Sequence, residues 1–371
     1  MGIRPEKKDV DLDRVRRSAV SRAFATSADL QTAVETLGFV QADPIRAPAR
    51  AQDLTLRHRA PAYRAGDLER RYATLAIEED FFINYGFLPR AVQALMHPRA
   101  AAQRIAGRNK RERALIEYVR ERGEVHPRDV DAHFSHGTVT NYWGGSSSAT
   151  THLLNQLHYR GVLRIARRDG GIRVYAIREP AIEALDRAER ERRMDRLIDV
   201  LVHKYAPLPG PTLSFLVRRL RYGVPQWERE LGRALIRTRA RLQQVRIGKI
   251  DWYWPVGESL VDGGVPDVVR LLAPFDPLVW DRDRFTALWG WEYRFEAYTP
   301  APKRKFGYYA LPLLWRDRVI GWGNLSTKGG VLDARIGYIA DRPPRERAFR
   351  RELDAELDRM RTFLALTPPD E

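Results

Sequence analysis

The clearest hydrophobic pattern lies between residues 111 and 177, where it predicts three helices and a two-stranded hairpin. Apolar residues recur at helical spacing over 111–122, 127–134 and 149–160. Gly161 ends the third helix, and strands are predicted over 162–166 and 173–177. The turn at 167–171 reads Arg-Arg-Asp-Gly-Gly, and its glycines can adopt the positive φ angles of a tight hairpin. This order of elements is typical of a winged helix.

Two further segments repeat this order. The later one has three helical patterns and two strands, over 194–204, 212–221, 226–241, 244–247 and 250–254. The earlier segment is less regular, with a helix over 10–25, a second helix capped near Ser27 and ending at Gly38, and a strand from Phe39 to Asp43. A charged helical connector is predicted over 180–193, and its charges are interpreted as a solvated face.

From Leu271 onward the pattern changes to a period of two residues, which predicts an antiparallel sheet. Strands are predicted over 291–297, 307–315, 319–326 and 331–338. A closing helix over 345–366 carries apolar residues at helical spacing and is expected to pack on the sheet.

The predicted fold is therefore mainly α with α+β character. It consists of three tandem winged-helix units and a C-terminal antiparallel β-rich domain with a closing helix. The predicted domain boundaries are 1–105, 106–180, 181–262 and 263–371.

The net charge of the chain indicates what kind of molecule it binds. Its 64 lysines and arginines exceed 48 acids, so the net charge is +16 and the pI about 10.2, which favours a polyanion. No apolar run approaches the roughly 20 residues that span a bilayer, and the first 16 residues are charged rather than signal-like. We expect a cytoplasmic, nucleoid-associated protein that does not bind membranes. No coiled-coil pattern is present, and we expect a monomer.

The residue types also restrict the chemistry. The chain has no cysteine, which excludes disulfides, thiolate zinc sites and iron–sulfur clusters. Its eight histidines lack the spacing of a zinc protease, and no glycine-rich phosphate loop is present. We therefore expect no metal ion and no nucleotide or other small-molecule cofactor.

Gln41 and Asp43 form the most informative short motif. In a strand, side chains two residues apart share a face, so an amide and a carboxylate would lie side by side, and Pro44 would end the strand. Such a pair can hold and polarise a water molecule or stabilise a cationic centre. A solvated strand end is the alternative interpretation.

Basic and polar residues supply candidate DNA contacts. The cationic candidates are Arg46, Arg50, Arg57, His58, Arg59, Arg167, Arg168, Arg173, Lys303, Arg304 and Lys305. Asn155 and Gln156, on the helix over 149–160, have side chains that can read adenine edges, although this helix could instead pack on another domain. The run 303–305 is expected at a hairpin tip, where it could reach a DNA groove or keep a sheet edge soluble. Three tryptophans could stack on bases or belong to the core: Trp143, Trp252 and Trp254.

Several of these motifs together resemble the winged-helix DNA glycosylases of the AlkZ/YcaQ type. Gln41-Ala42-Asp43 is similar to the family's Gln-x-Gln or Gln-x-Asp catalytic motif. The C-terminal runs 272–282, 298–309 and 311–314 continue the resemblance, which covers nearly the whole chain. Asn84-Tyr85 stands where the family commonly has an ionisable pair, and 323–330 also departs from its pattern. The chain therefore resembles a divergent member of the Gln-x-Asp branch.

The resemblance implies three winged helices around a concave DNA-binding surface and a monofunctional glycosylase for N7- or N3-alkylated purines, with interstrand crosslinks and bulky adducts as further substrates. It assigns Asp43 to water activation and stabilisation of the C1′ cation, and Gln41 to water orientation. Double-stranded DNA with a damaged base is the expected partner. Two alternatives are a non-catalytic DNA-binding regulator and a bifunctional glycosylase with an amine nucleophile, which would have to be a lysine distant in sequence.

Overall fold

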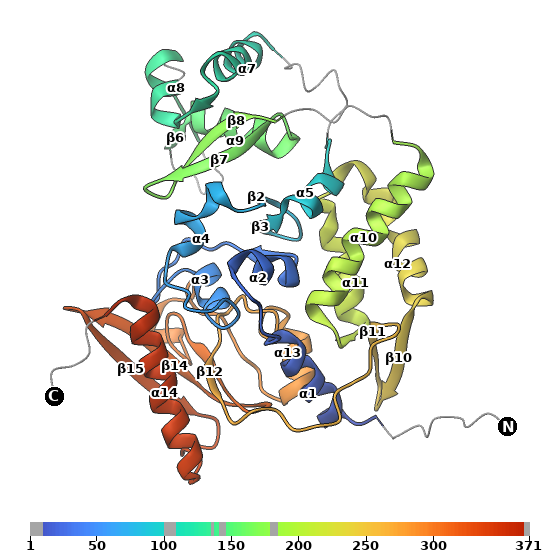
Figure 1. Ribbon diagram of the computed structural model, residues 1–371, viewed down its shortest axis with the longest axis vertical. Helices are drawn as coiled ribbons and strands as arrows, with labels where there is room; N and C mark the ends of the chain where they lie inside the picture. Colours follow the sequence, from blue (N-terminus) through green and yellow to red (C-terminus); the bar gives the residue numbers. More distant parts are fainter. Residues whose placement is uncertain (1–9, 100–108, 135–136, 141–145, 179–184, 367–371) are drawn as a thin grey trace. The chain divides into compact units, whose positions relative to one another are not determined.

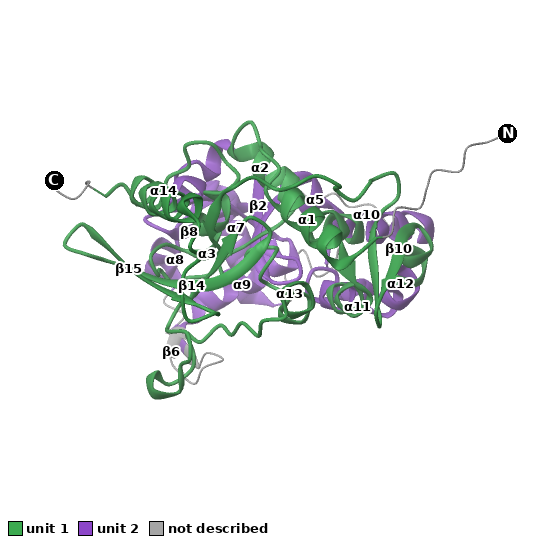
Figure 2. Ribbon diagram, turned by 90° about the horizontal axis from the view of Figure 1, so that it is seen from below, with its two compact units in different colours: residues 1–65, 198–216, 235–371 green, residues 66–197, 217–234 purple. Residues whose placement is uncertain are grey.

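The computed structural model describes residues 10–99, 109–134, 137–140, 146–178 and 185–366 of the 371-residue chain (Figure 1). The chain divides into two compact units, and each combines segments that are far apart in sequence (Figure 2). Unit 1 takes residues 1–65, 198–216 and 235–371. Unit 2 takes residues 66–197 and 217–234.

Unit 1 begins with two helices and a very short strand. Its first elements are α1 (Leu12–Ala23), α2 (Leu30–Leu37), β1 (Val40–Gln41) and α3 (Ala51–Leu56). The Asp29 carboxylate caps α2 by accepting from the Thr32 amide, so the predicted cap near Ser27 was two residues early. Gly38 ends α2 with φ +63°, as predicted.

A four-stranded antiparallel sheet forms the C-terminal part of unit 1. Its order is β12 (Val269–Leu271), β13 (Leu311–Trp315), β14 (Arg318–Lys328) and β15 (Val331–Tyr338). Helix α14 (Arg347–Leu364) packs against β12 and buries Phe349, Met360 and Phe363. The predicted sheet and closing helix are confirmed.

The predicted strand over 291–297 was wrong. In this segment Tyr293 is buried between exposed Glu292 and Arg294, but the segment joins no strand ladder. The Tyr293 hydroxyl donates to the Ala310 carbonyl, and the Trp291 ring stacks on Trp322. The alternation of aromatic and polar residues that predicted a strand is therefore explained by side-chain packing and not by pairing in a sheet. Because this strand is absent, the run 303–305 begins at the last residue of the short helix η4 (Ala301–Lys303) rather than occupying a hairpin tip.

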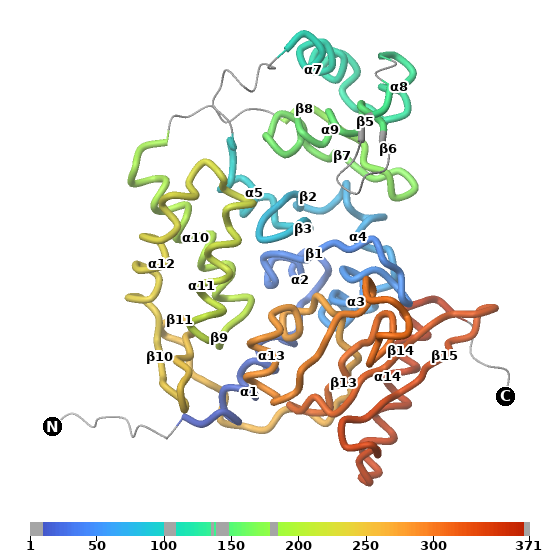
Figure 3. Tube along the Cα trace, turned by 180° about the vertical axis from the view of Figure 1, so that it is seen from behind, coloured from blue at the N-terminus to red at the C-terminus, as the bar shows by residue number. Residues whose placement is uncertain are grey.

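Helix α13 (Arg282–Trp289) was not predicted. The Asp281 carboxylate caps its first turn, and Gly290 ends it with φ +68°. In Figure 3, α1 lies beside α13, and the Arg16 guanidinium donates to the Leu288 carbonyl, 272 residues away in sequence. The two ends of the chain thus contribute to one core.

A second sheet of unit 1 has the order β10 (Leu242–Ile247), β11 (Ile250–Pro255) and β9 (Leu208–Pro209). Its predicted hairpin is confirmed, because Ile247 pairs with Ile250 across Gly248-Lys249. Trp252 and Trp254 are 1% and 7% exposed, so they belong to the core. Trp143 lies outside the described residues.

Unit 2 contains most of the second predicted segment. Its helices are α4 (Asp67–Arg70), α5 (Arg90–Met96), α7 (Lys110–Arg122), α8 (Pro127–Phe134) and α9 (Ala149–Arg160). Its strands are β2 (Ile77–Phe81), β3 (Tyr85–Pro89), β4 (Glu124–Val125), β5 (Thr138–Thr140), β6 (Ser146–Ser148), β7 (Leu163–Asp169) and β8 (Ile172–Ile177). The β7–β8 turn is only Gly170-Gly171, so Arg167 and Arg168 lie within β7 rather than in the predicted turn.

Each of the three remaining long helices includes, in sequence, a boundary between the two units. They are α10 (Arg187–Tyr205), α11 (Gly210–Arg219) and α12 (Leu231–Ala240), with the short helices η2 (Leu220–Tyr222) and η3 (Pro225–Glu230) between the last two. Residues 187–193 of the predicted connector and the helix over 194–204 form the single helix α10, since no glycine or proline interrupts this stretch. Residues 180–184 of the predicted connector lie outside the described residues. The described chain is thus a mixed α/β protein with antiparallel sheets. Among the described residues, no helix is both long and apolar enough to cross a bilayer.

Candidate active site

Gln41 is held by a tryptophan from a distant segment. The Trp280 Nε1 donates to Gln41 Oε1 at 2.7 Å, and Gln41 is 8% exposed. An indole nitrogen can only donate, so this contact identifies Oε1 as the acceptor and sets the orientation of the amide. The amide nitrogen has no hydrogen-bond partner within the described ranges and remains available as a donor.

Asp43 lies beyond the end of β1, so the predicted side-by-side placement on one strand face does not apply. Its Oδ1 instead accepts from the Ile45 amide at 2.9 Å, and its own amide donates to Gln52 on α3. The second carboxylate oxygen accepts no hydrogen bond from the described part of the chain. Burial raises the pKa of the half-buried Asp43, although the Ile45 hydrogen bond opposes this. The carboxylate is therefore anchored through one oxygen and has the other available.

The segment that contains Tyr298 is closed by hydrogen bonds to a buried carboxylate. The buried Glu296 carboxylate accepts from the backbone amides of residues 305, 306 and 307, at distances of 2.7 to 3.3 Å. Burial, followed by the negative charge on Asp43, raises the pKa values of Tyr298 and Tyr309. Tyr298 is 78% exposed, whereas Tyr309 is buried.

Three of the predicted DNA contacts are used inside unit 1. Arg57 pairs with the fully buried Glu356, and Arg59 pairs with the fully buried Asp276. The His58 ring bonds to the Leu271 carbonyl, and burial lowers its pKa well below the ordinary value. These side chains connect α3 to the C-terminal part of the unit. Within the same predicted set, Arg46, Lys303 and Lys305 are exposed, and Arg50 and Arg304 are half-buried.

The predicted contacts in unit 2 differ in exposure. Arg168 and Arg173 both pair with the buried Glu79, and Asn155 accepts from Arg173 and from the Tyr175 hydroxyl. The exposed Arg167 pairs with Glu124 at 3.0 Å. The exposed Gln156 bonds to His152. Arg167 and Gln156 are the members of this group most open to a ligand.

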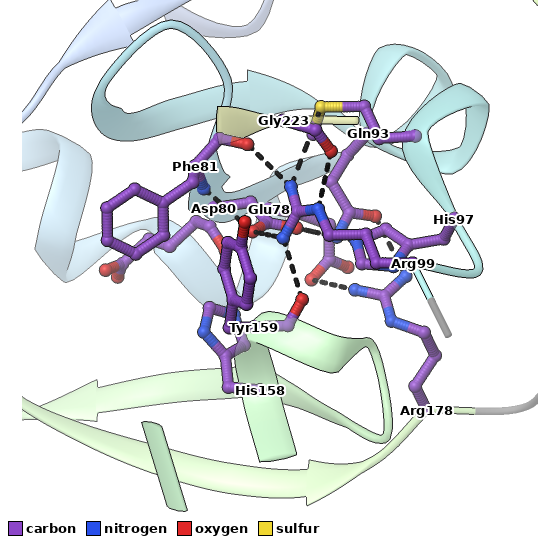
Figure 4. Close-up of polar contacts among 12 residues, drawn as sticks. Glu78, Asp80, Phe81, Gln93, His97, Arg99, His158, Tyr159, Arg178 and Gly223 are labelled. Carbon is purple, nitrogen blue, oxygen red and sulfur yellow. Dashed lines mark hydrogen bonds and ion pairs between the residues drawn. The ribbon is translucent and has the colours of Figure 1, made fainter. Parts of the chain in front are cut away.

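Sequence analysis missed a buried acidic run on β2. Glu78, Glu79 and Asp80 are 2%, 0% and 0% exposed. Figure 4 shows Asp80 beside Gln93, His97 and Arg99, each of which donates to it at 2.7 Å. The sequence does contain a signal for this buried run, because three consecutive acids stand between apolar residues. It does not identify the side chains that bond to these acids.

Arg99 extends this network across unit 2. Its guanidinium also donates to the carbonyls of Phe81, Tyr159 and Gly223, and it lies over the Tyr159 ring. Burial would raise the pKa of Asp80, but Arg99 and the His97 hydrogen bond hold it well below its ordinary value. Burial lowers the pKa of His97 to about 4, so a neutral imidazole donates to Asp80 through Nε2. We interpret the network as structural.

Lys204 is a buried amine near the Gln41 segment. Its Nζ donates to the Phe39 carbonyl, and Lys204 is 7% exposed. Burial, together with the nearby Arg59 charge, lowers its pKa to about 7. The side chain therefore holds the backbone two residues before Gln41.

This buried amine predicts a specific pH dependence of stability. Between pH 7 and about 10.5 the unfolded state retains a proton on Lys204 that the folded state has lost, so its contribution becomes more favourable as pH rises. We expect the free energy of unfolding of wild type, relative to Lys204→Met, to increase by at most about 1.4 kcal/mol per pH unit in this window. Urea unfolding at pH 6.5, 8 and 9.5 measures the difference, and a pH-independent value would contradict the prediction.

Comparison with known proteins adds independent evidence. Residues 34–363 match the family described as DNA glycosylase AlkZ-like. The solved structure of Streptomyces sahachiroi DNA glycosylase AlkZ is similar, with a TM-score of 0.61 and 14% sequence identity over 97% of this chain and 99% of that chain. At this identity the structural match demonstrates a shared fold, while the family match spans most of the sequence. The chain therefore belongs to the AlkZ-like DNA glycosylase family.

Proposed function

We propose that this protein is a monofunctional DNA glycosylase that hydrolyses the N-glycosidic bond of N7- or N3-alkylated purines, including those in interstrand crosslinks and bulky adducts. The observation that carries the proposal is the pair formed by an anchored, half-buried carboxylate and a tryptophan-oriented amide, Asp43 and Gln41. Family membership supports the same reaction class.

The chemistry matches these two groups. An alkylated purine carries positive charge, so it leaves readily and needs little help from a general acid. Positive charge then develops at C1′, where the Asp43 carboxylate stabilises it and accepts a proton from the attacking water. The Gln41 amide nitrogen donates to that water and orients it.

Binding to duplex DNA follows from charge. The net charge of +16 favours the phosphate backbone, and Arg46, Lys303 and Lys305 are exposed cations of the unit that contains Asp43. We further propose that the repeated helix and hairpin segments act as three winged helices, with the boundaries given above. The exposed Arg167 and Gln156 are their best-placed DNA contacts in unit 2.

The direct test uses duplexes that contain one N7-methylguanine or one nitrogen-mustard crosslink, with an undamaged duplex of the same sequence as control. Incubation with the full chain, followed by alkali, should cleave the strand at the lesion only. Tight, salt-sensitive binding without release of any base would instead favour a non-catalytic DNA-binding regulator. Preference for one undamaged sequence would strengthen that alternative.

Lys204 makes the bifunctional alternative testable. A lyase needs a neutral amine at C1′, and this amine has a pKa of about 7. Its burial and its bond to the Phe39 carbonyl argue against access to the sugar. We therefore expect borohydride to trap no covalent complex with abasic DNA. A trapped complex that Lys204→Met abolishes would establish the bifunctional enzyme.

A further inference from the structure

Tyr298 presents its aromatic ring to solvent. It is 78% exposed, the largest exposed fraction of any aromatic side chain in the described part of the chain, and Tyr308 in the same loop is 44% exposed. The Tyr298 ring meets Phe295 edge-on, with the ring centroids 6.0 Å apart. A single exposed aromatic residue is ordinary on a protein surface, whereas two on one loop form a patch that a ligand can cover.

The loop that carries both tyrosines is held by polar contacts that do not involve their rings. The buried Glu296 carboxylate accepts from the backbone amides of residues 305–307. The Asn324 amide nitrogen donates to the Phe306 carbonyl at 2.6 Å, and the same side chain leaves no room for a Cβ at Gly307. Because these contacts fix the backbone, the loop loses little conformational entropy when a ligand binds to it.

Arg304 connects the two tyrosines. Its Nε donates to the carbonyl of Thr299, the residue that follows Tyr298, at 2.7 Å. Its guanidinium lies over the Tyr308 ring, 5.1 Å from the ring centroid. The two rings and a planar cation therefore belong to one patch within unit 1, and rings and guanidinium groups are both suited to stacking on flat aromatic ligands.

The charge of the loop favours an anionic ligand. Lys303 and Lys305 are exposed, and neither these lysines nor Arg304 forms an ion pair with a carboxylate within the described ranges. Between residues 296 and 317 the sequence contains no acid. A ligand that matches both the cations and the exposed rings carries negative charge and flat aromatic groups, and nucleic acid has both.

We propose that Tyr298 stacks on a nucleobase displaced from a DNA duplex while Lys303 and Lys305 bind phosphates beside it, an inference that rests on the DNA binding proposed above. A base inside a duplex is already stacked on both faces by its neighbours, so an exposed ring can stack only on a base that has left the helix. Stacking accepts any base, because every base has an aromatic face. The loop then binds distorted sites more tightly than intact duplex.

Fluorescence anisotropy with the full chain and two undamaged, labelled duplexes tests the inference. One duplex is fully paired, and the other has the same sequence with one additional unpaired adenine. We expect wild type to bind the second duplex at least about fivefold more tightly, and Tyr298→Ala to lose this preference while its affinity for the paired duplex stays close to wild type. Tyr298→Phe keeps the ring and should keep the preference. Both variants should retain the wild-type melting temperature within a few degrees, since the side chain is exposed.

Lys303→Ala is the control for contacts with phosphate. Phosphates are present in both duplexes, so this substitution should weaken binding to both by the same factor and leave the preference for the unpaired base unchanged.

The outcomes separate this inference from the glycosylase. Equal affinity of wild type for the two duplexes, or a preference that survives in Tyr298→Ala, would overturn the stacking role. A loss in Tyr298→Phe as large as in Tyr298→Ala would also overturn it, because the hydroxyl and not the ring would then make the contact. These measurements use no alkylated base, so a failure to release N7-methylguanine would refute the glycosylase and leave their results unchanged.

Discussion

Asp43→Asn should reduce single-turnover release of N7-methylguanine by about a hundredfold or more. The substitution keeps the shape of the side chain and the bond from the Ile45 amide, but removes the negative charge and the proton acceptor. Both losses act at the transition state, where C1′ is cationic and the water is losing a proton. Enzyme in excess over a lesion duplex, quenched in alkali over time, measures the rate without interference from product release.

A matched substitution separates catalysis from DNA binding. Asp43→Asn also raises the net charge by one, which strengthens attraction to DNA. Asp199→Asn makes the same change of charge at a partly exposed carboxylate that pairs with Arg241 in the same unit. We expect this control to retain the wild-type rate. Equal rates for the two variants would remove Asp43 from the mechanism.

The largest expected effect on stability is at Asp80. Asp80→Asn should lower the free energy of unfolding of unit 2 by about 3–5 kcal/mol, because it leaves the buried Arg99 guanidinium without its counter-charge. Urea unfolding followed by circular dichroism measures the loss. Hydrogen exchange in peptides that cover residues 77–99 assigns the loss to unit 2.

The pH dependence of this loss has a definite sign. The folded-state pKa of Asp80 is lowered, so its stabilising contribution is present above the unfolded-state value of about 3.9 and disappears as pH falls through the lower folded value. The difference between wild type and Asp80→Asn should therefore be constant from pH 5 to 8 and shrink only below about pH 4. Glu117→Gln breaks an exposed pair with Arg120 and should change stability by less than about 1 kcal/mol. A similarly small effect of Asp80→Asn would contradict the structural role of the network.

Elements with strong local signals were predicted accurately. The bounds of α8, α9 and β15 agree with the predicted ranges, since helical or alternating burial and local end signals all lie within each segment. The segment over 291–297 shows the limit of this argument. Its aromatic residues alternate as in a strand, but the segment joins no strand ladder, and Trp291 instead stacks on Trp322.

The candidate site also combines residues that the local sequence identified with contacts that only distant segments supply. Gln41 and Asp43 were identified from a motif three residues long, and their chemistry follows from residue type. Their surroundings come from distant segments. Trp280, which orients Gln41, lies 239 residues away, and Glu356, which binds Arg57, lies 299 residues away. Arginines that were interpreted as phosphate contacts, such as Arg59 and Arg168, are instead paired with buried acids.

The sequence by itself determined the family, the basic charge, the main helices and strands, and the identity of the amide and carboxylate, because local periodicity and residue chemistry are properties of short segments. Tertiary structure alone decided which arginines remain exposed and which acids are buried. The physical reason is that the energy of a charged or polar group depends on its solvation and its partners. Both are set when segments hundreds of residues apart pack together, and neither can be read from the local sequence.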